Sequence, residues 1–226
     1  MNAGSRSLPP RPILCLITQR SYARERTLPA LIEAAVDGGV NMVQLREKDL
    51  SQEDMLALAH QAREAIQGRA LLLVNQQIDV ALACGADGIQ LGEEAMSVES
   101  VRERVGDQIL IGRSVHSVES AQEAEERGAD FLIVGTVSPT ASKPGVAPAG
   151  LGLLSHIAGA VTIPFLAIGG VNRDNVAQVM EHGSSGAAVI SAILGAADPG
   201  QAARDITEEM RQASINARSI GAMVRS

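Results

Sequence analysis

Aromatic side chains are nearly absent from this 226-residue chain: they make up 1% of it, and tryptophan is missing altogether. Hydrophobic residues nevertheless account for 46% of the sequence. A sizeable core must therefore be built from aliphatic side chains, which dominate the interior of β/α barrels. The same scarcity removes the flat rings on which nucleic-acid bases stack.

Positive charge and long apolar runs are also scarce. The net charge is −7 and no basic stripe is present, so we expect no nucleic-acid partner. The longest apolar runs are too short to cross a bilayer, and the polar, proline-rich residues 1–12 are unlike a signal peptide. We therefore expect a cytoplasmic protein with no membrane partner.

Cysteine is limited to two residues, Cys15 and Cys84, which lie in separate apolar segments. In a reducing cytosol such residues are expected to be buried free thiols. The pair does not have the spacing of a metal site.

Eight short apolar runs alternate with longer amphipathic stretches. The runs occupy residues 13–18, 42–46, 70–74, 88–91, 109–112, 131–135, 165–169 and 187–191. Near-continuous apolar strands between amphipathic helices are typical of a parallel sheet covered by helices. Eight such units predict the α/β class and, within it, a closed (β/α)8 TIM barrel forming a single domain.

The predicted barrel spans residues 13–212. Residues 1–12 are interpreted as an N-terminal lead-in. Residues 213–226 are interpreted as a flexible C-terminal tail, because their apolar spacing is weak. No linker divides the chain between these two segments.

Chemistry in such barrels lies in the loops after the C-terminal ends of the strands. Polar and charged residues follow strands two to six at these positions: Gln44, Arg46 and Lys48; Asn75; Glu93 and Glu94; Arg113 and His116; and Thr140, Ser142 and Lys143. The only two lysines, against seventeen arginines, both fall in these loops. A compact ammonium suits phosphate, so we interpret them as ligand-binding, the alternative being solvated loop residues.

Strands seven and eight end in Gly169-Gly170 and in Ile190-Ser191. Barrels often hold phosphate in these two loops, on backbone N–H groups that glycine leaves accessible. We therefore predict a phosphate site here. Alone, the glycine pair could simply turn the chain.

His116 is the histidine placed at the end of a predicted strand, on the face where chemistry is expected. Histidine takes up and returns protons near neutral pH. Position alone leaves two interpretations open: an acid/base, or a packed histidine that holds a loop.

Six motifs resemble those of the thiamine phosphate synthase and TenI superfamily, in the same order and over nearly the whole chain. They are QLREK (44–48), GADGIQLGE (85–93), GRSVHS (112–117), SPTASKPG (138–145), IPFLAIGGV (163–171) and GAAVISAI (186–193). The resemblance implies a thiazole phosphate bound at Gly169, Gly170 and Ser191. It also implies that Gln44, Arg46, Lys48, Asn75 and Lys143 hold the remaining substrate groups.

The synthases of this superfamily join an aminopyrimidine-methyl diphosphate to a thiazole phosphate, and two aspartates bind Mg²⁺. At those two positions the chain has Gln76 and Ala95. Mg²⁺ prefers carboxylate oxygens, so we expect no cofactor and no metal in this chain. If the chain is a synthase, Mg²⁺ is expected, and Glu93 or Glu94 would have to replace the missing aspartates as its ligand.

The motif GRSVHS is closer to TenI-like thiazole tautomerases, which move a proton without metal. The leading hypothesis is therefore a tautomerase with His116 as acid/base, helped by Arg113 or another cation near the substrate carboxylate. A thiamine phosphate synthase is the second hypothesis, and a non-catalytic phosphate-binding regulatory protein is the third. The expected partner is a small-molecule thiazole phosphate, and a homodimer is left open.

Overall fold

The computed structural model describes residues 7–23, 25–139 and 147–223, with side chains up to residue 216. The strands are β1 (Ile13–Ile17), β2 (Met42–Leu45), β3 (Leu71–Asn75), β4 (Gly88–Leu91), β5 (Leu110–Val115), β6 (Phe131–Gly135), β7 (Phe165–Ile168) and β8 (Gly186–Val189). The helices are η1 (Arg20–Tyr22), α1 (Leu28–Asp37), α2 (Gln52–Ile66), α3 (Ile78–Ala83), α4 (Val98–Val105), α5 (Val118–Glu126), α6 (Gly150–Ala160), α7 (Val176–Glu181), α8 (Ser191–Leu194) and α9 (Pro199–Met223).

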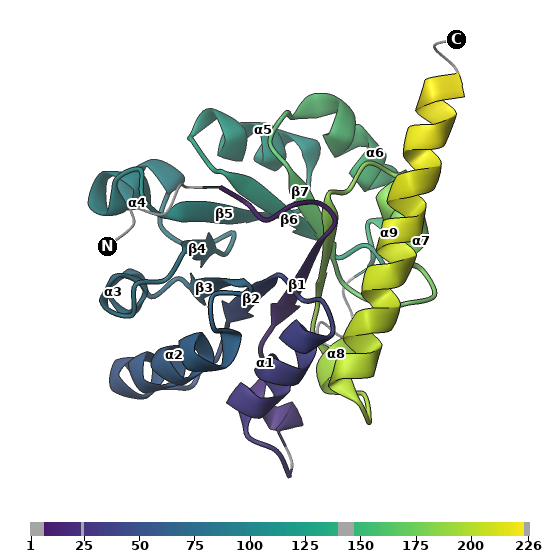
Figure 1. Cartoon of the computed structure of the whole chain (residues 1–226). Coiled ribbons are helices and arrows are strands. Elements are labelled where there is room, and N and C mark those ends of the chain that lie inside the picture. The colour runs from purple at the N-terminus through teal and green to yellow at the C-terminus, as the bar shows by residue number, and fades with distance from the viewer. Residues whose placement is uncertain (1–6, 24, 140–146, 224–226) are drawn as a thin grey trace.

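The eight strands form one closed parallel barrel in sequence order, with β8 pairing with β1. Figure 1 shows the helices around the outside of the sheet, with the long α9 in yellow. The predicted (β/α)8 barrel is confirmed, and every predicted apolar run overlaps a strand. No helix within the described ranges is long and apolar enough to span a membrane.

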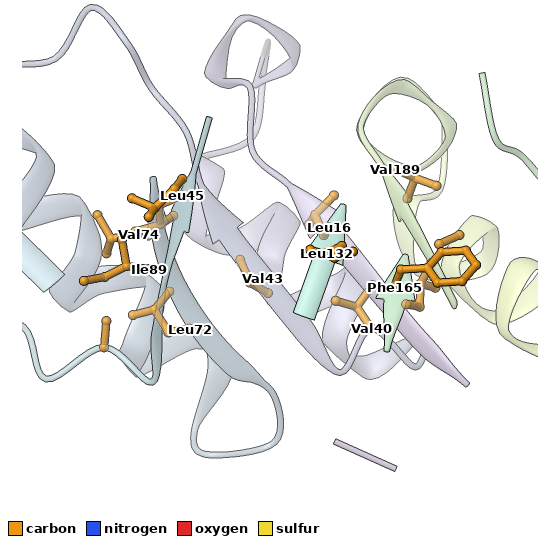
Figure 2. Packing of buried hydrophobic residues seen from close by; sticks show 14 of the residues in the cluster. Leu16, Val40, Val43, Leu45, Leu72, Val74, Ile89, Leu132, Phe165 and Val189 are labelled. Atoms are coloured by element: carbon orange, nitrogen blue, oxygen red, sulfur yellow. The ribbon is translucent and has the colours of Figure 1, made fainter. Parts of the chain in front are cut away.

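Period-two alternation along the strands produces two apolar layers. Leu14 and Leu16 of β1 face the helices, while Ile13, Cys15 and Ile17 belong to a separate cluster inside the barrel. Figure 2 shows part of the outer layer, in which labelled side chains such as Leu16 pack between strands and helices. The two phenylalanines are divided between the layers, Phe131 inside and Phe165 outside.

Local capping explains where several helices begin. Ser51, Ser97 and Ser117 each accept a hydrogen bond from the backbone N–H three residues later, at the starts of α2, α4 and α5. Such caps satisfy backbone donors that a helix leaves free. They also end each preceding loop at a defined point on the C-terminal side of the barrel.

The C-terminal segment differs from the sequence-based expectation. Residues 213–223 continue α9 as regular helix instead of forming a frayed tail. The apolar face of α9 explains this in part, because Met210 and Ala213 are buried in the described structure. Helix α9 packs against α1, α7 and α8, so tertiary packing supports a helix whose own apolar spacing is weak.

Candidate active site

The barrel interior is polar at the C-terminal end of the strands. Gln44, Asn75, Gln90 and Ser114 share the strand alternation of the inner cluster, and so point inward. The Gln44 amide donates to Asn75 Oδ1 at 3.1 Å, and the Gln90 amide donates to Ser114 Oγ at 3.1 Å. The Oε1 atoms of Gln44 and Gln90 are buried and have no hydrogen-bond partner in the described structure. Buried acceptors of this kind are costly unless a donor reaches them.

A pocket of about 400 Å³ opens above this polar layer. That volume lies within the range typical of small-molecule sites. Nine residues predicted from the sequence line the pocket together: Gln44, Arg46, Lys48, Asn75, His116, Gly169, Gly170, Ile190 and Ser191. The structure therefore brings residues from five different strand–loop units into one cavity at the expected face.

Two cations reach the pocket because side chains continue to alternate after β2. Arg46 and Lys48 line the cavity, whereas Glu47 turns away, is 5% exposed and accepts the backbone N–H of Arg20 at 3.0 and 3.1 Å. The backbone N–H of Arg46 donates to the hydroxyl of the fully buried Thr18 at 3.0 Å. The loop after β2 is thus anchored on both sides of its two cations. Neither cation forms an ion pair within the described residues.

His116 stands at the pocket wall after β5. Its Nδ1 hydrogen-bonds the carbonyl oxygen of Gly135, and because a carbonyl can only accept, Nδ1 carries a proton. The other ring nitrogen, Nε2, lies 3.4 Å from Oε2 of Glu93. The imidazole is therefore held between a backbone carbonyl and a carboxylate.

The glycine pair after β7 allows a close approach of two loops. Gly169 and Gly170 have φ angles of +98° and +63°, which favour glycine. A Cβ at Gly169 would lie 2.4 Å from Cγ2 of Thr136, and one at Gly170 would lie 2.4 Å from the carbonyl oxygen of Pro139. These positions require glycine for space as well as for conformation.

The short helix α8 begins at Ser191, directly after β8, with Ile190 as the preceding residue. Both residues line the pocket beside Gly169 and Gly170. Loops after the seventh and eighth strands are the usual place for phosphate in this fold. The arrangement agrees with the predicted site, although phosphate binding itself stays a prediction.

Arg113 has a different role from the one predicted. It does not line the pocket; its guanidinium donates to the carbonyl oxygens of Glu93 at 2.7 Å and Met96 at 3.1 Å. Partial burial lowers the pKa of Arg113 from its ordinary value. Arg113 thus ties the loop after β4 to β5.

Three predicted residues, Thr140, Ser142 and Lys143, lie outside the described residues. Conversely, Gln19, Ser114 and Thr136 line the pocket although the sequence analysis did not place them among the site residues. Ser114 could have been found from strand alternation, since it follows the inward-facing Gly112 by two positions.

Fold and cavity together define a class: a (β/α)8 barrel with a small polar pocket at the C-terminal end of its strands, bordered by cations and by a glycine-rich turn. Comparison with known sequences is more specific. The model of the TMP-TENI family, described as thiamine monophosphate synthase, matches residues 14–193. The chain belongs to this family.

Individual relatives agree with this assignment. A thiamine-phosphate synthase of Roseiflexus sp. (strain RS-1) is 42% identical over 194 residues, covering 85% of this chain and 82% of the relative. One from Pyrococcus abyssi (strain GE5 / Orsay) is 44% identical over 182 residues, covering 80% and 86%. The solved structure of a thiamine phosphate pyrophosphorylase from Pyrococcus furiosus has a TM-score of 0.81 at 37% identity, and covers 89% of this chain and 96% of that one.

These findings correct the leading sequence-based hypothesis. We expected a thiazole tautomerase, which is an isomerase, in preference to a synthase, which is a transferase. This expectation is wrong, because the curated relatives are named synthases. The error came from giving one short motif around His116 and two missing aspartates more weight than similarity over most of the chain. In the structure, His116 is also held by Gly135 and Glu93, so its place in the motif did not by itself define an acid/base.

The residues at the two positions of the synthase aspartates do not fit a Mg²⁺ ion. Gln76 supplies a neutral amide and Ala95 has no donor in its side chain. Within the described residues, no three His, Cys, Asp or Glu side chains gather as a potential metal site. Mg²⁺ is usually bound through one or two carboxylates together with substrate phosphates and water, and neither position 76 nor position 95 supplies a carboxylate.

Proposed function

We propose that this chain is a thiamine phosphate synthase. It would join hydroxymethylpyrimidine diphosphate to thiazole phosphate: the bond between the pyrimidine methylene carbon and the diphosphate oxygen breaks, a bond from that carbon to the thiazole nitrogen forms, and pyrophosphate leaves. The observation that supports the proposal is a pocket lined by Arg46 and Lys48 and by the Gly169–Gly170 turn with Ser191, in a chain whose relatives are named synthases.

The first end serves the diphosphate. Arg46 and Lys48 enter the pocket from one loop, and neither is neutralised by an ion pair within the described part of the chain. A guanidinium can hold two phosphate oxygens at once, and an ammonium adds a compact charge. These groups stabilise the negative charge that develops on the leaving diphosphate.

The second end serves the phosphate of the thiazole. Gly169 and Gly170 line the pocket without side chains that would keep a ligand from their backbone N–H groups, and Ser191 lines the same pocket at the start of α8. Phosphate held here would fix the thiazole ring between the two ends. Holding two reactants in a productive geometry lowers the entropic part of the barrier.

Between the two ends lies the polar floor of the barrel. The unpartnered Oε1 of Gln44 can accept an N–H from the aminopyrimidine, while Asn75 orients the Gln44 amide through their 3.1 Å hydrogen bond. A buried amide that finds its missing donor in the substrate favours that substrate over analogues without the amino group.

The test is the formation of thiamine phosphate and pyrophosphate by the purified full chain supplied with both substrates, with and without Mg²⁺. We expect Lys48→Met to lower kcat/KM by about 10²–10³-fold, since one charge-stabilising group at the leaving atoms is lost. The matched control is Arg204→Met, which removes an exposed cation on α9 and is expected to leave the rate unchanged. Absence of product from the unmodified chain under both conditions would refute the proposed function.

A further inference from the structure

Position 76 offers no charge to a metal ion. Gln76 follows β3 with a left-handed φ of +60°, and its backbone N–H donates to the carbonyl of Gln90 at 3.1 Å. Its side chain lines the pocket, and the amide nitrogen packs over Gly92, 2.6 Å from where a Cβ would stand there. The group that faces the cavity is therefore a neutral amide resting on the turn after β4.

Position 95 faces away from the pocket. Ala95 packs against the outer apolar layer and is absent from the pocket wall. Its N–H closes a turn with the carbonyl of Gly92 at 3.1 Å, and the two hydrogen bonds from Arg113 to the carbonyls of Glu93 and Met96 hold that turn against β5. The loop is thus fixed in a conformation that directs residue 95 into the core.

Two carboxylates remain on this side of the pocket, and they do not form a metal site with their neighbours. Glu93 faces Nε2 of His116 at 3.4 Å, and its side chain is 57% exposed. Glu94 also lines the pocket. With Glu93 turned to His116, Glu94 would have to supply the protein's carboxylate beside the Gln76 amide, and water and substrate phosphate would fill the rest of the octahedral shell.

The opposite wall has the complementary charge. Arg46 and Lys48 point into the cavity from a loop that Thr18 and Glu47 anchor through backbone hydrogen bonds. Two cations held in place can neutralise a diphosphate directly, with no metal as intermediary.

We propose that this chain binds the diphosphate end of its substrate through Arg46 and Lys48 without an Mg²⁺ ion anchored by its own carboxylates, in contrast to synthases with aspartates at positions 76 and 95. The inference rests on the proposed function, because it presumes that a diphosphate occupies the pocket. Beyond the proposed function, it states that protein side chains alone neutralise the negative charge of the leaving diphosphate.

The test is calorimetric titration of inorganic pyrophosphate into the full chain, once with Mg²⁺ in excess and once with EDTA. We expect Mg²⁺ not to tighten binding, and to weaken it to the extent that the ion complexes free pyrophosphate in competition with Arg46 and Lys48. Lys48→Met should weaken binding by tenfold or more under both conditions, while the matched control Arg204→Met should leave it unchanged.

A variant whose pyrophosphate binding should depend on Mg²⁺ provides a second test. Gln76→Asp adds a carboxylate to the pocket wall; we expect it to weaken binding in EDTA by about tenfold through repulsion, and Mg²⁺ to restore the lost affinity. If Mg²⁺ increases the affinity of the unmodified chain for pyrophosphate tenfold or more, the proposal is overturned. Loss of that increase in Glu93→Gln or in Glu94→Gln would then identify the carboxylate that holds the ion.

Failure of this inference and failure of the proposed function are distinguishable. Pyrophosphate binding that Mg²⁺ does not tighten, in a chain that forms no thiamine phosphate, would support the metal-independent site and refute the synthase. Product formation together with strongly Mg²⁺-dependent pyrophosphate binding would do the reverse. A chain that binds no pyrophosphate under either condition would refute both.

Discussion

Replacement of Gly112, even by alanine, is expected to destabilise the barrel. It lies inside the barrel on β5, in register with Phe131 of β6. A Cβ at this position would lie 2.3 Å from Cζ of Phe131 and 2.2 Å from Oε1 of Gln90. The ring would have to retreat by about 1 Å to reach ordinary contact, yet Phe131 is only 1% exposed and is packed within the inner layer.

Overpacking of this kind costs about 1–3 kcal/mol. We therefore expect Gly112→Ala to lower the free energy of unfolding by that amount, and to lower Tm by about 2–12 °C for a chain of this size. Urea unfolding gives the first quantity and a thermal scan the second. The matched control is Gly152→Ala in α6: no atom lies within 4 Å of its Cβ, so this variant should gain up to about 1 kcal/mol from helix propensity.

A double-mutant cycle tests the cause. Phe131→Leu alone should cost about 1 kcal/mol or more, because it leaves a cavity. Combined with Gly112→Ala, however, it removes the clash with the ring, although not the one with Oε1 of Gln90, so the loss in the double variant should fall short of the sum by about 1 kcal/mol. An unchanged stability of Gly112→Ala, or strictly additive losses, would refute the steric argument.

Three further predictions concern the rest of the barrel. Burial raises the pKa of the Cys15 thiol to about 12 and also raises that of Cys84; a thiol reagent at pH 8 should therefore label neither in the folded chain and both in guanidinium, and rapid labelling of Cys15 would contradict its burial. Arg102 donates to three backbone carbonyls and to Asp130 at 2.7 Å, so Arg102→Met should cost about 2–4 kcal/mol in urea unfolding, and a loss below 0.5 kcal/mol would refute this role. Burial alone would raise the pKa of Glu125, but hydrogen bonds from the loop before β7 outweigh it and lower the pKa. The contribution of the ionised Glu125 to folding stability is therefore present above the carboxyl's unfolded-state pKa of about 4.3 and is lost as pH falls below it. Glu125→Gln should reduce the loss of stability between pH 5 and pH 3, and an unchanged dependence of stability on pH in this range would argue against this role.

Much of the barrel was predictable because its signals are local. Each strand is a short apolar run whose period is visible in the sequence, and serine caps mark the starts of α2, α4 and α5. The end of α9 was not predictable in this way. It continues a helix whose preceding part packs against α1, α7 and α8, and weak apolar spacing within residues 213–223 does not reveal that continuation.

The candidate site was predictable to the extent that strand order determines it. Once eight strands are assigned, residues after their C-terminal ends must meet, and Arg46, Lys48, Asn75 and His116 do so. Side-chain direction within a loop was not predictable. Arg113 follows the same rule of position, yet its guanidinium turns to the carbonyls of a neighbouring loop, a choice that depends on three-dimensional proximity.

The closure of the barrel has a consequence for how the chain is made. Strand β1 pairs with β2 along one edge and with β8 along the other, and α9 lies so close to the end of α1 that a Cβ at Gly38 would meet the carbonyl oxygen of Gly200 at 2.3 Å. A ribosome makes β8 and α9 long after β1, so one apolar edge of β1 stays unpaired until β8 has been made. A nascent chain arrested before residue 186 is therefore the form of this protein most exposed to aggregation and to capture by chaperones.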